Sequence, residues 1–295
     1  MTVDLTVELS PRIAVVVPCF NDGATLEETV RSILTQEPTE LVVVDDGSND
    51  PLTLQVMQRL EHRGVRVVRQ ENRGLAEARM AGVRATSAPY VFPLDADDML
   101  LPGALTALAD SLDTHADAVA AWGDTEFFGD AKVVVRSADR IDPWRTTFVN
   151  ELPVMSLFRR RALLDAGGWT PKGGYEDWDL WMALAERGWG GVHIGRSVAR
   201  YRVRGGRMWR DSAFRHDEIF AELRDRHPDL FANRHANRRR STSSAFVKLA
   251  LPLVERAPLS AQRRIALGNV MTRPGPTLNL IIRRRLAHIR RRIAG

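Results

Sequence analysis

Cysteine is scarce in this chain, and long apolar runs are absent. Its 295 residues contain one cysteine, Cys19, which excludes an internal disulfide and a zinc site built on cysteines. No window reaches the ~18 consecutive apolar residues that a membrane-spanning helix needs. Residues 1–10 carry two acids and no apolar core, unlike a secretory signal. These absences predict a protein of a reducing compartment, and we expect it in the cytoplasm.

Acidic residues are nearly missing from the C-terminal part. Residues 231–295 contain fifteen Lys or Arg side chains and one acid, Glu255, for a formal charge of +14. Because the whole chain is +5, residues 1–230 carry −9. The composition also shifts to Arg-rich helical segments after Gly205 and Gly206. We therefore expect one domain at residues 1–205 and a basic helical extension at residues 206–295.

The first part of the chain alternates short apolar runs with helical periodicity, the pattern of βα units around a parallel sheet. Thr25 with Glu28 forms a capping pattern that predicts one helix start, and Asp50 before Pro51 predicts another. Residues 127–153 lack this alternation and are expected to be irregular or antiparallel. The predicted strands cover residues 13–17, 41–44, 65–68, 90–94 and 118–122, and the predicted helices include residues 25–36, 51–63, 75–86, 159–166 and 176–187. The fold class is therefore α/β.

Polar clusters follow four of the predicted strands. Ligands of open α/β sheets bind outside the carboxyl ends of the strands, so these clusters are expected to form one site. The clusters are Asn21-Asp22-Gly23, Asp45-Asp46-Gly47-Ser48, Asn72-Arg73-Gly74 and Asp95-Ala96-Asp97-Asp98.

The cluster Asp95-Ala96-Asp97-Asp98 concentrates three carboxylates in four residues. Such groups repel one another unless a cation or a proton compensates, which favours a divalent metal. The other interpretation is a solvated turn that caps the following helix. That helix has its apolar positions at Leu105, Leu108 and Leu112.

A nucleotide diphosphate would use these groups in three ways. Its base needs a hydrogen-bonding partner such as Asp46, and its diphosphate needs a cation held by Asp95 and Asp97. Arg79 is placed to contact the phosphates or to pack beneath them. Two alternatives stay open: Asp45 and Asp46 as turn residues before Asp50, and Arg79 as an ordinary ion-paired residue.

Five segments together resemble the family 2 glycosyltransferases, in the order and spacing of that family. The resemblance runs from about Ile13 to Tyr201. It implies a GT-A fold with a mixed sheet flanked by helices. It also implies a nucleotide-diphosphate sugar donor, with UDP as the expected nucleotide and GDP or dTDP as the alternatives. It also implies Mn²⁺ or Mg²⁺, inversion at the anomeric carbon, and a glycan or lipid-linked acceptor. The segments are Val17-Pro18-Cys19-Phe20-Asn21, Val44-Asp45-Asp46-Gly47-Ser48, Asn72-Arg73-Gly74-Leu75-Ala76 with Ala78-Arg79, Asp95-Ala96-Asp97-Asp98 and Gly174-Tyr175-Glu176-Asp177-Trp178-Asp179-Leu180-Trp181.

The resemblance assigns roles to individual residues. Asp46 matches the position that contacts the donor base, and Asp97, assisted by Asp95, matches the metal ligand. Asp177, in the pair with Glu176, matches the base that deprotonates the acceptor hydroxyl, which direct inversion requires. The alternative for this pair is that two acids merely favour the positive end of the helix they begin. Pro18, Phe20 and Asn21 match the segment that lines the nucleotide pocket.

The chain departs from the family pattern after Tyr201. Many relatives have a Tyr-Arg-x-His segment there, whereas this chain reads Tyr201-Arg202-Val203-Arg204 and has no histidine at that place. If that histidine helps to bind the metal in relatives, this chain lacks the ligand. Arg204 or Arg207 is then expected to contact the diphosphate directly.

Residues 277–293 have the pattern of a basic amphipathic helix, with apolar positions three and four residues apart and six arginines around them. The pattern favours an anchor on an anionic membrane surface, here the inner face of the membrane, or a helix packed on the catalytic domain. Two other functions stay open. A sugar nucleotidyltransferase would normally have a glycine-rich phosphate loop after the first strand, which is absent here. A non-enzymatic nucleic-acid-binding protein would leave the acidic edge unexplained, so no nucleic-acid partner is expected.

Overall fold

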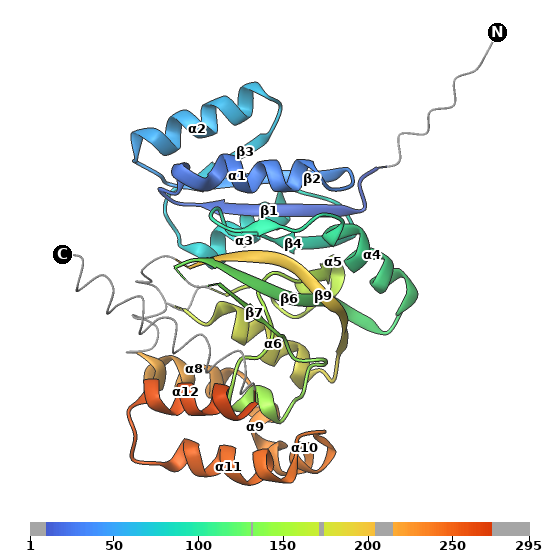
Figure 1. The fold of residues 1–295 in the computed structure, drawn as a ribbon, viewed down its shortest axis with the longest axis vertical. Helices are drawn as coiled ribbons and strands as arrows, with labels where there is room; N and C mark the ends of the chain where they lie inside the picture. The colour runs from blue at the N-terminus through green and yellow to red at the C-terminus, as the bar shows by residue number, and fades with distance from the viewer. Residues whose placement is uncertain (1–9, 131, 171–173, 204–214, 273–295) are drawn as a thin grey trace.

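The computed structural model describes residues 10–130, 132–170, 174–203 and 215–272, and it is built around one mixed β-sheet (Figure 1). The strand order is β3-β2-β1-β4-β8-β6-β9-β5, and β7 pairs with β6. The strands are β1 Ile13–Cys19, β2 Thr39–Asp46, β3 Arg66–Gln70, β4 Tyr90–Pro93, β5 Met99–Leu100, β6 Ala118–Gly129, β7 Val133–Val135, β8 Leu157–Arg159 and β9 Gly190–Val203. The expected α/β class with a mixed sheet and flanking helices is confirmed.

Helices cover both faces of the sheet. The helices are α1 Gly23–Leu34, α2 Pro51–His62, α3 Leu75–Arg84, α4 Ala104–Thr114, the 3-10 helix η1 Arg145–Thr147, α5 Arg160–Asp165, α6 Glu176–Glu186, α8 His216–Arg226, α9 Pro228–Ala232, α10 Arg234–Arg240, α11 Ala245–Arg256 and α12 Ala261–Thr272. Side chains alternate across a strand, so β1 contributes to two cores. Val15 and Val17 join the core with α1, α2 and α4, whereas Val16 joins the core with α3, α6 and α8.

The parallel half of the sheet consists of β3, β2, β1 and β4. All seven residues of β1 are buried, because a parallel strand covered by helices on both faces is apolar on both. The predicted βα pattern is therefore confirmed for this half. Its strands all end on the left in Figure 1, so their following loops share one edge.

The other half of the sheet was largely missed by the sequence analysis. Strand β6 continues to Gly129, well beyond the predicted end at residue 122, and it pairs antiparallel with β7 and β8 and parallel with β9. Strand β9 has fourteen residues and was not predicted. Most of its residues are partly or fully exposed and it carries several arginines, so it has no apolar run by which to recognise it.

The start of α1 corrects one prediction, and the start of α2 confirms another. Helix α1 begins at Gly23, two residues before Thr25, and the expected capping box does not form. The Gly23 N–H instead donates to Thr53 Oγ1 of α2 at 2.9 Å, so a distant residue satisfies this helix end. Asp50 caps α2 as expected, accepting from the Thr53 N–H at 2.8 Å.

The C-terminal helices pack against the sheet domain. Phe220 and Leu223 of α8 and Leu230 of α9 lie in the same core as Trp178 and Trp181 of α6. The expected division after residue 205 and the amphipathic segment 277–293 lie outside the described residues. No helix in the described ranges combines the length and apolar character needed to cross a bilayer.

Helix α3 packs so closely on β1 that we predict a measurable cost for one added methyl group. A Cβ at Gly82 would meet Val16 Cγ1 at 2.2 Å, so Gly82→Ala should lower the free energy of unfolding by about 1–3 kcal/mol in urea titration. Gly190→Ala is the control, since a Cβ there meets nothing within 4 Å. Equal stability of the two variants would contradict this account of the packing.

Candidate functional site

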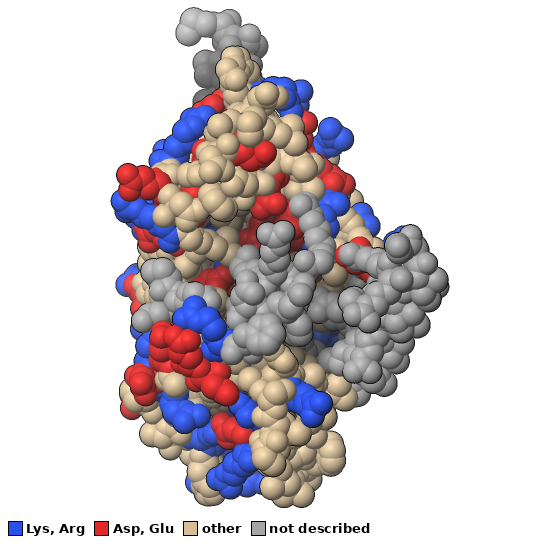
Figure 2. Space-filling view, turned by 90° about the vertical axis from the view of Figure 1, so that its left-hand side faces the viewer, with Lys and Arg blue, Asp and Glu red and all other residues tan. Residues whose placement is uncertain are grey.

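The loops after β1, β2 and β4 lie at the carboxyl edge of the parallel strands, and Arg79 links the β4 loop to the start of α6. The side of the molecule on which these strands end is the face shown in Figure 2, and acidic side chains gather near its centre. All five segments that suggested a function in the sequence contribute side chains to the contacts described below. The prediction that they share one edge agrees with these contacts.

Asn21 fixes the loop after β1. Its φ of 58° is left-handed, which asparagine tolerates better than most residues. Its Oδ1 accepts from the backbone N–H groups of Asn49 and Asp50, both at 2.9 Å, and its own N–H donates to Ser48 Oγ at 3.1 Å. Phe20 beside it is 45% exposed. The loop therefore presents an open aromatic ring on a hydrogen-bonded support, while Pro18 is buried within β1.

Asp46 is buried and joins β2 to the loop after β3. Its Oδ1 accepts from Gln70 Nε2 at 2.7 Å and from the Arg73 N–H at 2.8 Å, and its Oδ2 accepts from the Gly74 N–H at 2.9 Å. A carboxylate has about four acceptor positions, so room for a further donor remains. Asp45 accepts from the Ser48 N–H at 2.8 Å, which makes Asp45 the turn residue of the pair.

Arg79 connects the Asp95 loop to α6. Its side chain is buried; Nη2 donates to Asp95 Oδ1 at 2.8 Å and Nη1 donates to Glu176 Oε1 at 3.0 Å. Burial acts to lower the pKa of Arg79, but the charges of Asp95 and Glu176 outweigh it and raise the pKa above its ordinary value. Two positions were expected for Arg79, in contact with the phosphates or packed beneath them. Its burial agrees with the second.

Four further hydrogen bonds fix the shape of the Asp95 loop. Thr29 Oγ1 of α1 donates to the carbonyl oxygens of Ala96 and Asp98, at 2.9 and 2.8 Å. The Arg202 N–H of β9 donates to Asp98 Oδ1 at 2.8 Å, and Arg202 Nε donates to the Asp97 carbonyl at 2.9 Å. The sequence analysis gave no role to Thr29, and no local signal marks it. Arg202 lies in the segment already compared with the family pattern, but its contacts depend on β9.

Asp98 is the fully buried member of the acidic cluster. Burial raises its pKa well above the ordinary value, and the charges of Asp95 and Asp97 add to that effect. Its Oδ2 has no hydrogen-bond partner among the described residues, and a buried carboxylate oxygen without a donor disfavours the charged form. Asp95 is paired with Arg79, which offsets part of the repulsion within the cluster.

Asp177 occupies the first turn of α6 and is partly buried. Burial and the neighbouring charge of Glu176 raise its pKa to about 6, against the lowering effects of Arg79 and of a hydrogen bond from Asn150. That bond runs from Asn150 Nδ2 to Asp177 Oδ2 at 2.9 Å. A raised pKa near neutrality suits a group that accepts a proton. Asn150 was missed because the residues around it lack a recognisable pattern.

The tryptophans near this segment belong to the core. Trp169, Trp178 and Trp181 are all buried, and the Trp178 Nε1–H donates to the Thr146 carbonyl at 2.8 Å. Packing, rather than stacking on a sugar, is therefore the role that their burial supports.

The donor atoms at this edge suit a hard divalent cation. No group of three His, Cys, Asp or Glu side chains within the described ranges is arranged to hold a metal. Asp95 and Asp97 nevertheless supply carboxylate oxygens, and Mg²⁺ in nucleotide sites is typically held by one or two carboxylates together with substrate phosphates. The residues fit a metal whose remaining ligands would arrive with a diphosphate. Arg204 and Arg207, expected near the diphosphate, lie outside the described residues.

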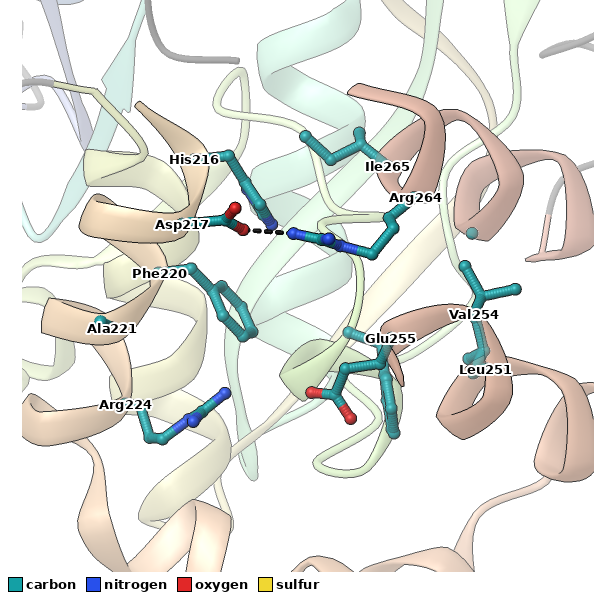
Figure 3. A pocket seen from close by; sticks show the side chains of 12 residues that line it. His216, Asp217, Phe220, Ala221, Arg224, Leu251, Val254, Glu255, Arg264 and Ile265 are labelled. Carbon is teal, nitrogen blue, oxygen red and sulfur yellow. Dashed lines mark hydrogen bonds and ion pairs between the residues drawn. The ribbon is translucent and has the colours of Figure 1, made fainter. Parts of the chain in front are cut away.

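A separate cavity of about 190 Å³ lies between α8, α11 and α12 (Figure 3). None of the site residues expected from the sequence lines it. Its Arg264 pairs with Asp217, and burial lowers the pKa of His216, whose Nδ1 lies 3.2 Å from the Tyr175 hydroxyl oxygen. The cavity therefore lies between helices and apart from the acidic edge, and its lining residue His216 contacts Tyr175, the residue before Glu176.

We predict that removal of the Arg79 charge destabilises the fold strongly. Arg79→Met leaves Asp95 and Glu176 without their buried cation, so the free energy of unfolding should fall by about 3–5 kcal/mol in urea titration. Arg59→Met removes an exposed pair with Glu27 and should cost less than about 1 kcal/mol. Adding Asp95→Asn and Glu176→Gln to Arg79→Met should recover part of the loss; equal losses in the Arg59 and Arg79 variants would refute the argument.

Comparison with known proteins agrees with this geometry. Residues 14–165 match the family model described as Glycosyl transferase family 2. An uncharacterized glycosyltransferase of Mycobacterium tuberculosis is 32% identical over 189 residues, which cover 62% of this chain and 83% of that protein.

Solved structures share the fold at low sequence identity. The Staphylococcus aureus protein TarS (residues 1–349, in complex with UDP-GlcNAc) superposes with a TM-score of 0.59 and 15% identity, covering 96% of this chain and 92% of that one. A mannosyltransferase from Pyrobaculum calidifontis, in complex with GDP-Man and Mn²⁺, gives 0.57 and 22%, covering 95% and 86%. With the family match over more than half of the chain, these findings show that the chain belongs to glycosyltransferase family 2 and is an enzyme that takes its sugar from a nucleotide-sugar donor.

Proposed function

We propose that this enzyme transfers its sugar with inversion, using Asp177 as the base, from a nucleotide-diphosphate donor bound at the Asp95–Asp98 loop. The observation that carries the proposal is the bridge through Arg79, which binds Asp95 on one side and Glu176, the neighbour of Asp177, on the other. A single buried guanidinium thus links the expected donor side to the expected base.

The reaction would proceed in one displacement. The acceptor hydroxyl oxygen attacks the anomeric carbon while its proton passes to the Asp177 carboxylate. The bond from the anomeric carbon to the diphosphate oxygen breaks, and the nucleotide diphosphate leaves. Asn150 orients the carboxylate through its hydrogen bond to Oδ2, and Arg79 offsets the charge of the neighbouring Glu176.

On the donor side, Asp97 with Asp95 would hold Mn²⁺ or Mg²⁺, which when bound offsets charge on the leaving diphosphate. Phe20 offers its exposed ring and Asn21 and Pro18 hold the backbone of the nucleotide pocket. Asp46 is positioned to accept from the base with its remaining acceptor capacity. The donors UDP-GlcNAc and GDP-Man in the two similar structures support a UDP or GDP sugar, and the Mn²⁺ in one of them supports a divalent metal.

Nucleotide and metal binding should be visible as a change in stability. A ligand at 100 times its Kd adds about 2.7 kcal/mol to the folded state, so UDP or GDP with Mn²⁺ should raise the Tm, and EDTA should remove most of that rise. Asp97→Asn should abolish the metal-dependent part and lower donor hydrolysis by ~10²-fold. Asp110→Asn, at an exposed carboxylate of α4, should behave as wild type. If no nucleotide raises the Tm and no nucleotide sugar is hydrolysed, the proposed donor site is wrong.

The rate should depend on the ionisation of Asp177. The base must be deprotonated, and a raised pKa of about 6 means that kcat should rise with pH up to about 6 and level off above it. Asp177→Asn should lower kcat by ~10²- to 10⁴-fold. The Tm at pH 7 should not fall, because the raised pKa means that the folded protein disfavours the charge at that position.

Asn150→Ala supplies a sharper control for this assignment. Its hydrogen bond lowers the pKa of Asp177, so its removal should shift the midpoint of the kcat profile to higher pH. An unchanged midpoint in Asn150→Ala, together with an active Asp177→Asn enzyme, would exclude Asp177 as the base while leaving the donor site untouched.

A further inference from the structure

Helix α11 carries an outward row of large apolar side chains. Phe246, Leu249 and Leu253 are 65%, 62% and 60% exposed. They are three and four residues apart, so they lie on one face of the helix. Burying such side chains is favourable, and an uncovered row of them marks an interaction surface.

The opposite face of α11 is firmly packed, so the outward row is not needed to hold the helix. Leu251 is 2% exposed, and a Cβ at Gly268 of α12 would lie 3.8 Å from its Cδ2. Glu255 accepts two hydrogen bonds from Arg234 of α10, at 2.9 and 3.0 Å. Helices α10 and α11 are thus joined by an ion pair, and both lie at the lower end of the molecule in Figure 1.

The segment of the chain that carries this row is strongly basic. Residues 231–272 contain eight Lys or Arg side chains and one acid, Glu255. Arg234 pairs with Glu255, and Arg264 pairs with Asp217. The other six have no ion pair with any residue in the described ranges: Arg238, Arg239, Arg240, Lys248, Arg256 and Arg263.

Charge decides which occupant suits the row. A second copy of this surface would bring unpaired arginines against arginines, and residues 277–293 of the same chain carry six more arginines. For either occupant, repulsion between like charges would oppose the free energy gained by burying the apolar side chains. An anionic lipid surface offers an apolar interior to Phe246, Leu249 and Leu253 and negative headgroups to the cations.

We propose that α10 and α11 dock this glycosyltransferase on anionic membrane surfaces, with Phe246, Leu249 and Leu253 inserted at the boundary between headgroups and acyl chains. The surface is distinct from the acidic donor edge, and the proposal does not depend on the identity of the donor, the metal or the base. It gives the enzyme direct access to acceptors that are themselves held in a membrane.

The test is co-sedimentation of the full-length protein with phosphatidylcholine vesicles that contain or lack phosphatidylglycerol. Wild type should bind the anionic vesicles at low salt and less at high salt, since screening weakens the attraction. The variant Phe246→Gln/Leu249→Gln/Leu253→Gln should bind at least about tenfold more weakly. Leu34→Gln is the matched control, because Leu34 of α1 is 66% exposed and lies outside the row; it should bind as wild type.

A charge variant tests the second half of the proposal. Arg238→Gln/Arg239→Gln/Arg240→Gln should weaken binding to anionic vesicles at low salt while retaining the fold. Equal binding by wild type and the triple apolar variant, or no binding by wild type, would overturn the proposal. So would a drop in Tm or a change in sedimentation coefficient of the apolar variant without vesicles, which would mean that the chain itself or a second copy covers the row.

Discussion

The site depends on the two ion pairs of the buried Arg79, with Asp95 and with Glu176. A guanidinium stays charged at any pH the protein meets, so burial is tolerable only with carboxylates in contact. Asp95 and Glu176 meet that need from segments that are 16 and 97 residues away along the chain. The requirement sets the position of the loop after β4 relative to the first turn of α6. The Asp95 loop and the turn that carries Asp177 are thus held by the same cation.

The low dielectric that strengthens these ion pairs also controls the other acids. Burial raises the pKa of Asp98 and of Asp177, but the consequences differ. Asp98 is fully buried and accepts a hydrogen bond from the backbone of β9, and its raised pKa favours the neutral form, which would lower the repulsion in the loop. Asp177 is only partly buried and is oriented by Asn150, so its raised pKa leaves it ionised at neutral pH and still able to accept a proton.

Much of the fold was predictable because its signals are local. The buried parallel strands are continuous apolar runs, and the Asp50 cap before Pro51 is encoded within four residues. The failures have an equally physical cause. Strand β9 is recognisable only by its pairing with β6. At the start of α1, the Gly23 N–H donates to Thr53 of another helix, a partner that the nearby sequence cannot reveal. Motif order led to the candidate residues, but not to their hydrogen-bond partners.

The sequence by itself determined that the chain has an acidic body and a basic C-terminal part, that its first half forms βα units, and that carboxylates gather at one edge of the sheet. These properties depend on composition, on periodicity and on residues close together in the chain. Only the tertiary structure decided which carboxylates are paired with Arg79 and in which carboxylates burial raises the pKa. Those differences depend on burial and on contacts between residues far apart in the chain, 97 residues for Arg79 with Glu176 and 27 residues for Asn150 with Asp177. The exposed row on α11 has the same origin, because sequence periodicity marks apolar positions but cannot show which of them the fold leaves uncovered.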